Sequence, residues 1–222
     1  MNRNFPWQPT ITPRQITAGG LGSHYVVGVS CGPWSAAVWT LTGELFTWGD
    51  GAFGILGHGT QESSSVPRRI DSVGIKDGVV LQAACGRWHT AAIVESDDNS
   101  RGLFMWGSNE SGQLGLTECQ EPEVLIPKKV EGLNNAVKVA VGNKFTCLLL
   151  DDGALLTCGK NRSGVLGRTD GNSKKFCRVV SGDLHSEGIV KHVACGSDHV
   201  AAVYCDGQSS GQLLVWGEGN GC

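Results

Sequence analysis

Short apolar stretches alternate with glycine-rich turns along the chain. Residues 25–31 and 35–41 indicate two β-strands, and Thr42-Gly43 predicts a tight turn into a third strand at 44–48. A glycine-rich loop and a short fourth strand near 67–70 follow. No stretch keeps the period of 3.6 residues that an amphipathic helix needs. The pattern therefore predicts an all-β protein with about four short strands in each unit of about 55 residues.

Glycine markers at regular spacing indicate that this unit occurs four times. The first marker follows Cys or Val, the second usually follows Trp, and the third follows Leu. Successive first markers are 54, 56 and 54 residues apart. Extra residues fall only in the hairpins at 96–102 and 206–211, where a repeat fold tolerates insertions. The markers are, in order, Gly32, Gly86, Gly142 and Gly196; Gly49, Gly107, Gly159 and Gly217; and Gly57, Gly115 and Gly167.

The residue before the second marker predicts how the units pack together. Trp48, Trp106 and Trp216 stand there, and we expect their rings to lie between neighbouring sheets. Cys158 takes this place in the third unit, which predicts either a looser contact or a neighbouring side chain that fills the space. Tight bends at Gly57 and its counterparts predict positive φ. Four-stranded sheets repeated around an axis form a β-propeller.

Two stretches of the second unit carry a family resemblance. They are Cys85-Gly-Arg-Trp-His-Thr-Ala-Ala-Ile93 and Leu103-Phe-Met-Trp-Gly-Ser-Asn-Glu-Ser-Gly-Gln-Leu-Gly115. Both resemble the regulator-of-chromosome-condensation repeat, and the similarity extends over about residues 13–222. Residues 46–59 also resemble plant proteins that carry this propeller between a pleckstrin-homology domain and a zinc-binding phosphoinositide domain. The resemblance implies a seven-bladed propeller that binds protein partners, including small GTPases, histones, ubiquitin-ligase components and photoreceptor partners.

Seven such units would need about 385 residues, whereas the chain has 222. We therefore expect an incomplete, open arc of about four four-stranded blades. In the alternative, a strand at 13–16 completes the last unit and closes a four-bladed ring. Sheets packed for sevenfold geometry would have to tilt much further to do this, which favours the arc. The expected divisions are a tail at 1–12, part of a preceding unit at 13–26, and repeats at about 27–80, 81–136, 137–189 and 190–222, the last incomplete.

Composition narrows the function classes. The net charge is −3 and no run of Lys or Arg is present, so nothing predicts nucleic-acid binding. Nine cysteines form no C-x-x-C pair. Cys31, Cys85 and Cys195 share one repeat position with Val141, which indicates small buried side chains and a reducing compartment, the cytoplasm or nucleus. The N-terminus does not resemble a secretory signal, and no apolar stretch is long enough to span a bilayer.

The loop after the first marker varies most between units, and loops at one end of a repeat scaffold usually carry recognition. Trp34 and Trp88 of this loop are expected either to anchor a partner or to pack against the adjacent blade. Asp198 resembles an acidic residue on the GTPase-binding face of exchange-factor members, and the alternative is a solvated acid. His89 and His199 share one repeat position. The side chain there is expected either to hydrogen-bond to the backbone or to contact a partner. The predicted partner-binding residues are Trp34, Arg87, Trp88, Lys144, Asp198 and His199.

Catalysis has little support in the sequence. Ser197, Asp198 and His199 are consecutive, so they cannot easily converge on one reacting atom. Histidines at one repeat position are too few for a metal site, and no phosphate-binding glycine motif is present, so we expect no metal and no cofactor. The leading hypothesis is a protein-interaction module. A guanine-nucleotide exchange factor and a truncated, non-functional product are the alternatives.

Overall fold

The chain folds into four antiparallel sheets, called blades 1 to 4 here, in a computed structural model that describes residues 12–180, 182–184, 188–205 and 211–219. Blade 1 contains β1 (Val26–Cys31), β2 (Ser35–Thr40), β3 (Leu45–Gly49) and β4 (Ser64–Arg69). Blade 2 contains β5 (Val79–Cys85), β6 (His89–Glu95), β7 (Arg101–Ser108) and β8 (Glu123–Lys129). Blade 3 contains β9 (Ala136–Val141), β10 (Phe145–Leu150), β11 (Leu155–Gly159) and β12 (Ser173–Arg178). Blade 4 contains β13 (Ile189–Cys195), β14 (His199–Cys205) and β15 (Gln212–Gly217).

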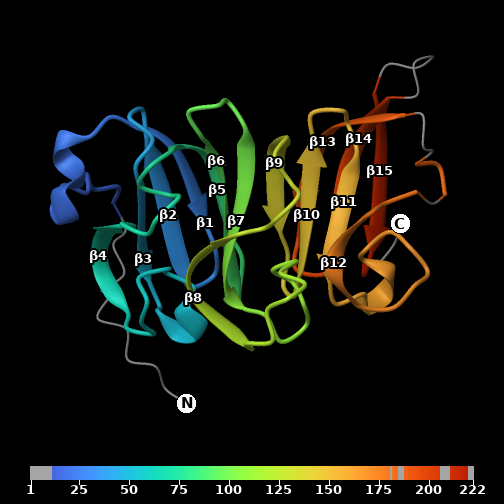
Figure 1. Cartoon of the computed structure of the whole chain (residues 1–222), viewed down its shortest axis with the longest axis horizontal. Helices are drawn as coiled ribbons and strands as arrows, with labels where there is room; N and C mark the ends of the chain where they lie inside the picture. The colour runs from blue at the N-terminus through green and yellow to red at the C-terminus, as the bar shows by residue number, and fades with distance from the viewer. Residues whose placement is uncertain (1–11, 181, 185–187, 206–210, 220–222) are drawn as a thin grey trace.

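The predicted all-β architecture is confirmed. Consecutive strands pair within each blade, and the four-stranded blades follow the order β1-β2-β3-β4. Figure 1 shows the four sheets standing side by side in chain order. Short 3₁₀ turns are the only helices among the described residues, namely η1 (Ala18–Ser23), η2 (Ala52–Gly54) and η3 (Arg162–Gly164), and no helix of the described ranges is long and apolar enough to cross a bilayer.

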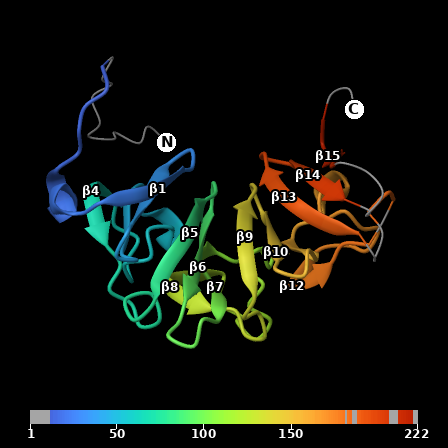
Figure 2. The same ribbon diagram turned by 90° about the horizontal axis from the view of Figure 1, so that it is seen from above.

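The blades form an open arc. Figure 2 shows blades 1 and 4 at opposite ends of a curved row. Residues 13–16, which would supply the closing strand of a four-bladed ring, are exposed and belong to no sheet. The arc is therefore the correct alternative of the two.

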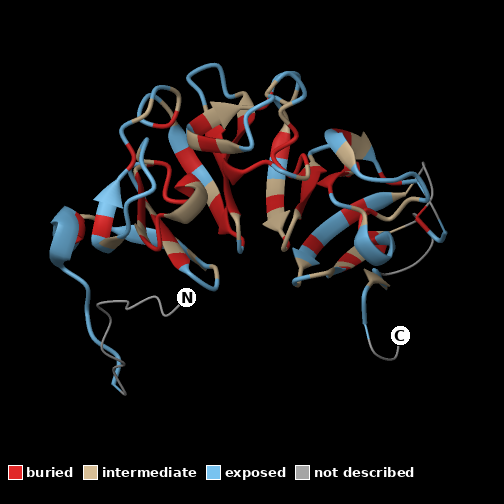
Figure 3. Cartoon of the chain, turned by 90° about the horizontal axis from the view of Figure 1, so that it is seen from below, coloured by how far each residue is buried: buried red, intermediate tan, exposed pale blue. Residues whose placement is uncertain are grey.

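The core lies between the blades. One apolar cluster joins blades 1, 2 and 3, and a second joins blades 3 and 4. Figure 3 shows that buried residues concentrate in the middle sheets. Side chains on the end blades are far more open to solvent: Val29 of β1 is 64% exposed and Leu213 of β15 is 69% exposed. Cys85 is buried as expected, but Cys195 is only half-buried and Cys31 is exposed, because no described blade covers that side of blade 1.

Each blade is joined to the one before it by a side chain that donates to a loop carbonyl. Trp106 Nε1 donates to the Ile55 carbonyl at 2.9 Å, and Trp216 Nε1 donates to the Val165 carbonyl at 2.9 Å. The predicted packing between sheets is confirmed for Trp106 and Trp216, whereas Trp48 packs against the Leu21, Val38 and Phe46 cluster of blade 1 and η1. In blade 3 Cys158 contacts the Gln113 carbonyl at 3.4 Å instead. A neighbouring ring, that of Phe176, fills the space the indole would occupy.

Two kinds of glycine allow the blades to approach so closely. Gly57 has φ +77°, and a Cβ there would lie 2.9 Å from Trp106 Nε1. Gly32 has no such φ, but a Cβ there would lie 2.5 Å from the carbonyl oxygen of Gly86 in the next blade. Gly32 and Gly86 are therefore needed for close contact with the next blade, whereas a Cβ at Gly142 or Gly196 would meet Phe145 or His199 of its own blade. The third-marker glycines are needed also for backbone conformation.

The 3₁₀ turn η1 packs on the outer face of blade 1. Leu21 is buried against Val38 and Phe46. Its place matches that of Ile75, which is buried between blades 1 and 2. The glycine before each of these residues has positive φ, +81° at Gly20 and +87° at Gly74. The segment before β1 thus has the local structure that joins one blade to the next.

Candidate interaction surface

The loops predicted to bind a partner all lie at one end of the blades. The loop between the first and second strand of each blade sits beside the loop after the third strand, because a backbone hydrogen bond joins them. The carbonyls of Trp34 and Trp88 accept N–H bonds from Asp50 and Ser108, both at 2.8 Å. Equivalent bonds join Lys160 to Lys144 and Glu218 to Asp198 in blades 3 and 4. In the described residues, these paired loops form one row along the four blades.

An aromatic stack lies in this row where the loops of blades 1 and 2 meet. The Arg87 guanidinium lies 5.0 Å from the centre of the Trp88 ring, in a cation–π contact. The Trp88 ring meets the Phe53 ring edge-on, with centroids 5.2 Å apart. Phe53 belongs to η2 of the preceding blade and has φ +60°, which is unusual for a bulky residue. Arg87 is exposed and Trp88 half-buried, so Phe53 supports the stack and the Arg87 end faces solvent.

The other predicted residues are used partly within the molecule. Lys144 forms an ion pair with Glu110 of the preceding blade, with Nζ and Oε2 3.1 Å apart. Between blades 3 and 4 the corresponding ion pair joins Glu218 to Arg162 of η3, with Oε2 and Nε 3.2 Å apart. Asp198 is half-buried and anchors its loop through its carbonyl, not through its carboxylate. The ion pairs of Lys144 and Glu218 link neighbouring loops.

The two histidines at the shared position have different environments. His89 is fully buried, and its Nε2 lies 2.8 Å from the Thr146 hydroxyl of the next blade. That hydroxyl donates to the Gln113 carbonyl at 2.7 Å, so it must accept from His89, and Nε2 carries the proton. Burial lowers the pKa of His89 to about 3. His199 is exposed on blade 4, where no further blade faces it.

Comparison with known proteins assigns the fold to a family. The model of the regulator of chromosome condensation (RCC1) repeat matches residues 42–93, 102–149 and 152–203. A second RCC1 repeat model matches residues 80–113 and 136–165. The chain belongs to the RCC1 repeat family. Each of the three longer matches runs from the third strand of one blade, or the turn before it, into the second strand of the next blade.

Relatives in the RCC1 family are much longer than this chain. It is 29% identical over 219 residues to the human E3 ubiquitin-protein ligase HERC2, which covers 96% of this chain and 4% of that protein. It is 31% identical to the probable human E3 ubiquitin-protein ligase HERC6, covering 95% and 20%. It is 34% identical to the Arabidopsis thaliana ultraviolet-B receptor UVR8, covering 93% and 44%. The chain therefore spans less than half the length of each of these relatives.

Solved RCC1 structures confirm the propeller arrangement. Human WBSCR16 superposes with a TM-score of 0.73 at 26% identity, over 88% of this chain and 48% of that one. Yeast RCC1 (Prp20), solved bound to Kap60, superposes with a TM-score of 0.69 at 25% identity, over 88% and 44%. The chain corresponds to about half of each of these propellers.

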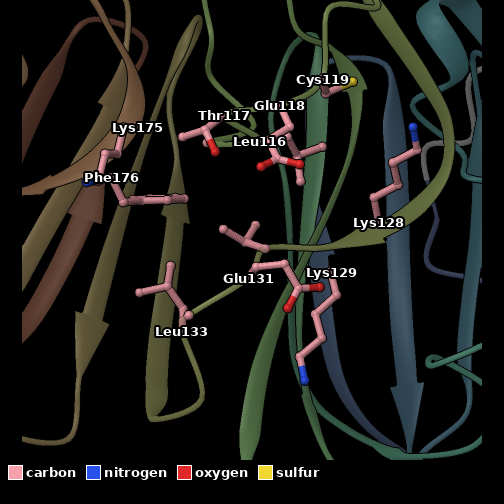
Figure 4. Close-up of a pocket in the computed structure, with 13 residues that line it drawn as sticks. Leu116, Thr117, Glu118, Cys119, Lys128, Lys129, Glu131, Leu133, Lys175 and Phe176 are labelled. Atoms are coloured by element: carbon pink, nitrogen blue, oxygen red, sulfur yellow. The ribbon is translucent and has the colours of Figure 1, made fainter.

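A smaller groove of about 380 Å³ lies at the contact between blades 3 and 4, and a larger one lies at the rim of the contact between blades 2 and 3. The larger groove has a volume of about 730 Å³. Phe176 of β12 lines it, together with residues of the loop after β7 and of the segment after β8. Figure 4 shows Phe176 reaching into this groove. The rim carries both signs of charge, so it favours neither anions nor cations; its charged residues are Lys128, Lys129, Lys175, Glu118 and Glu131.

Sequence reasoning missed the partners in the loop after the third strand. Phe53, Glu110 and Arg162 each contact a neighbouring loop. An aromatic residue in a glycine-rich loop, where the other repeats have Ser111 and Ser163, was the available signal. In the described residues no three His, Cys, Asp or Glu side chains come together as a metal site.

Proposed function

We propose that this chain is a protein-interaction module, an RCC1 scaffold whose row of loops binds a protein partner. Small GTPases are the partner class to test first, because the family resemblance implies them. Binding, not catalysis, is the proposed activity, and the cytoplasm or nucleus is the proposed compartment. The yeast RCC1 relative was solved in complex with another protein, Kap60, which supports protein recognition by this fold.

The observation that carries the proposal is the exposed stack of Arg87 on Trp88. Arg87 makes no ion pair with any described residue, so its charge is available to a carboxylate. Stacking on Trp88 and bracing by Phe53 limit the conformations that binding would have to restrict. Trp34 lies in the neighbouring loop and is 42% exposed. Arginine and tryptophan are the residue types that most often dominate binding energy at interfaces.

A binding panel tests this proposal. The full chain is titrated with purified small GTPases in GDP-bound, GTP-bound and nucleotide-free forms. We expect Arg87→Ala and Trp34→Ala each to weaken binding of a responding GTPase about tenfold, or about 1.4 kcal/mol. Lys76→Ala is the matched control, because it also removes an exposed charge but lies in the β4–β5 connection at the other end of the blades. Lack of binding by every GTPase excludes that partner class. Binding that neither Arg87→Ala nor Trp34→Ala weakens excludes this surface.

Nucleotide exchange is the alternative activity. An exchange factor stabilises the nucleotide-free GTPase and thereby weakens nucleotide binding by linkage. Release of labelled GDP from the same panel distinguishes the alternatives, because a simple binding module leaves the release rate unchanged. A non-functional truncated product is the remaining alternative. A monomeric chain that melts in one sharp transition would argue against it.

A further inference from the structure

The contact between blades 3 and 4 brings together two cysteines, each at a fixed position of the repeat. The third residue of β10 is Cys147, and its counterparts in blades 1 and 2 are Ala37 and Ala91. Across the contact, the last residue of β13 is Cys195. Its counterparts are Cys85 in blade 2 and Val141 in blade 3. At these two repeat positions only blades 3 and 4 supply a pair of thiols, although Cys31 of blade 1 also lies near Cys85 of blade 2.

The packing places these two thiols together. β10 contacts β13 across the boundary between the blades. Cys147 is fully buried in the cluster that joins blades 3 and 4, and Cys195 packs against that cluster while remaining half-buried. Interaction with the Cys195 thiol, together with burial, raises the pKa of Cys147 well above its usual value. Cys158 is on the strand beside Cys147 but faces the other way, toward the Gln113 carbonyl of blade 2.

We propose that Cys147 and Cys195 form a redox modification site, at which a hydroperoxide produces a disulfide between blades 3 and 4. The half-buried Cys195 is the thiol that the oxidant reaches first. The fully buried Cys147 is the resolving thiol, because it packs in the same cluster as Cys195 and is shielded from the oxidant.

The reaction proceeds in two steps. Cys195 Sγ attacks one oxygen of the hydroperoxide and the O–O bond breaks. This leaves a sulfenic acid on Cys195, and the thiol proton leaves with the alcohol or water that is released. Cys147 Sγ then attacks Cys195 Sγ, so the S–S bond forms and the S–O bond breaks. The hydroxide leaves as water with the Cys147 proton. The peroxide accepts two electrons, one from each sulfur.

The cross-link would lie directly beneath two loops of the interaction surface. Cys147 follows Lys144 by three residues, and Cys195 precedes Asp198 by three. These loops are already joined, since the Asn143 N–H donates to the Ser197 carbonyl at 2.9 Å. A disulfide would fix blade 4 to blade 3 and restrict the unfolded chain between the two cysteines.

Oxidation of the full chain with hydrogen peroxide, followed by peptide mapping without reduction, tests the proposal. We expect a peptide pair joined through Cys147 and Cys195, a melting temperature raised by several degrees, and reversal of both by dithiothreitol. The repeat itself supplies conservative control variants: Cys147→Ala matches blades 1 and 2, and Cys195→Val matches blade 3. Each should fold and should lose both the cross-link and the peroxide-induced stabilisation.

Cys158→Ala is the matched control, because it removes a buried cysteine of the same blade that faces away from blade 4. It should retain the Cys147–Cys195 cross-link. A predominant disulfide between any other pair would overturn the proposal. So would thiols at 147 and 195 that remain reduced while exposed Cys31 is oxidised to a sulfinic acid. Neither outcome depends on partner binding, so this test is independent of the proposed function.

Discussion

Replacing Thr146 by valine should cost more stability than the same change at its counterpart Thr90. The Thr146 hydroxyl donates to the Gln113 carbonyl and accepts from His89, all within the core. Valine has nearly the same shape, so the change leaves a buried His89 N–H without a partner and weakens satisfaction of the carbonyl. Each such orphaned group costs about 1–3 kcal/mol, which gives a loss of about 2–4 kcal/mol.

Thr90 provides the matched comparison. Its hydroxyl donates to the Ile55 carbonyl at 2.8 Å, but that carbonyl also accepts from Trp106. Thr90→Val therefore leaves no acceptor unpaired and should cost only about 1 kcal/mol. The difference of about 2 kcal/mol corresponds to a melting temperature about 4–8 °C lower for Thr146→Val in a chain of this size.

Urea unfolding followed by tryptophan fluorescence and circular dichroism measures both losses. A double-mutant cycle isolates the His89 contribution. In a His89→Phe background, which copies Phe145 of blade 3, Thr146→Val should cost only about as much as Thr90→Val. The reasoning is refuted if Thr146→Val is no more destabilising than Thr90→Val in the wild-type chain, or if the cycle shows no coupling.

Two further predictions follow from the same contacts between blades. Burial lowers the pKa of His89 from 6.5 to about 3. As the pH falls below 6.5, His89 takes up a proton in the unfolded chain but not in the folded one, so the free energy of unfolding should decrease. The loss should approach about 1.4 kcal/mol per pH unit relative to His89→Phe, measured by urea titrations at several pH values, and equal slopes would contradict it. Gly57→Ala should destabilise the chain by roughly 2 kcal/mol more than Gly164→Ala. Both glycines have positive φ, but only at Gly57 would a Cβ meet Trp106, with nothing within 4 Å at Gly164; similar thermal shifts for the two variants would refute this.

The fold was largely predictable because one signal recurs in every unit. Strands were expected at 25–31 and 35–41 and are found at Val26–Cys31 and Ser35–Thr40. The aromatic position between blades was also correct, because a bulky residue beside a marker glycine has few places to pack. A single copy of the motif would have supported neither inference.

The interaction surface was less predictable because its contacts cross between blades. The spacing identified the loops that hold Arg87 and Lys144. It did not show that Lys144 pairs with Glu110, whereas Arg87 makes no ion pair with a described residue. His89 was expected to bond to backbone and bonds to the Thr146 hydroxyl. That partner is 57 residues away, so no local pattern indicates it.

The blades taper from rim to axis. Near the axis, backbone meets backbone at Gly32 and Gly86, whereas farther out the indole of Trp106 separates the sheets. Narrow inner and wide outer contacts make each blade a wedge, and the size of the outer side chain sets how sharply the row bends. The curvature of the row is therefore set separately at each contact between neighbouring blades. Exchanging Cys158 for tryptophan should change the bend at that one joint and leave the others as they are.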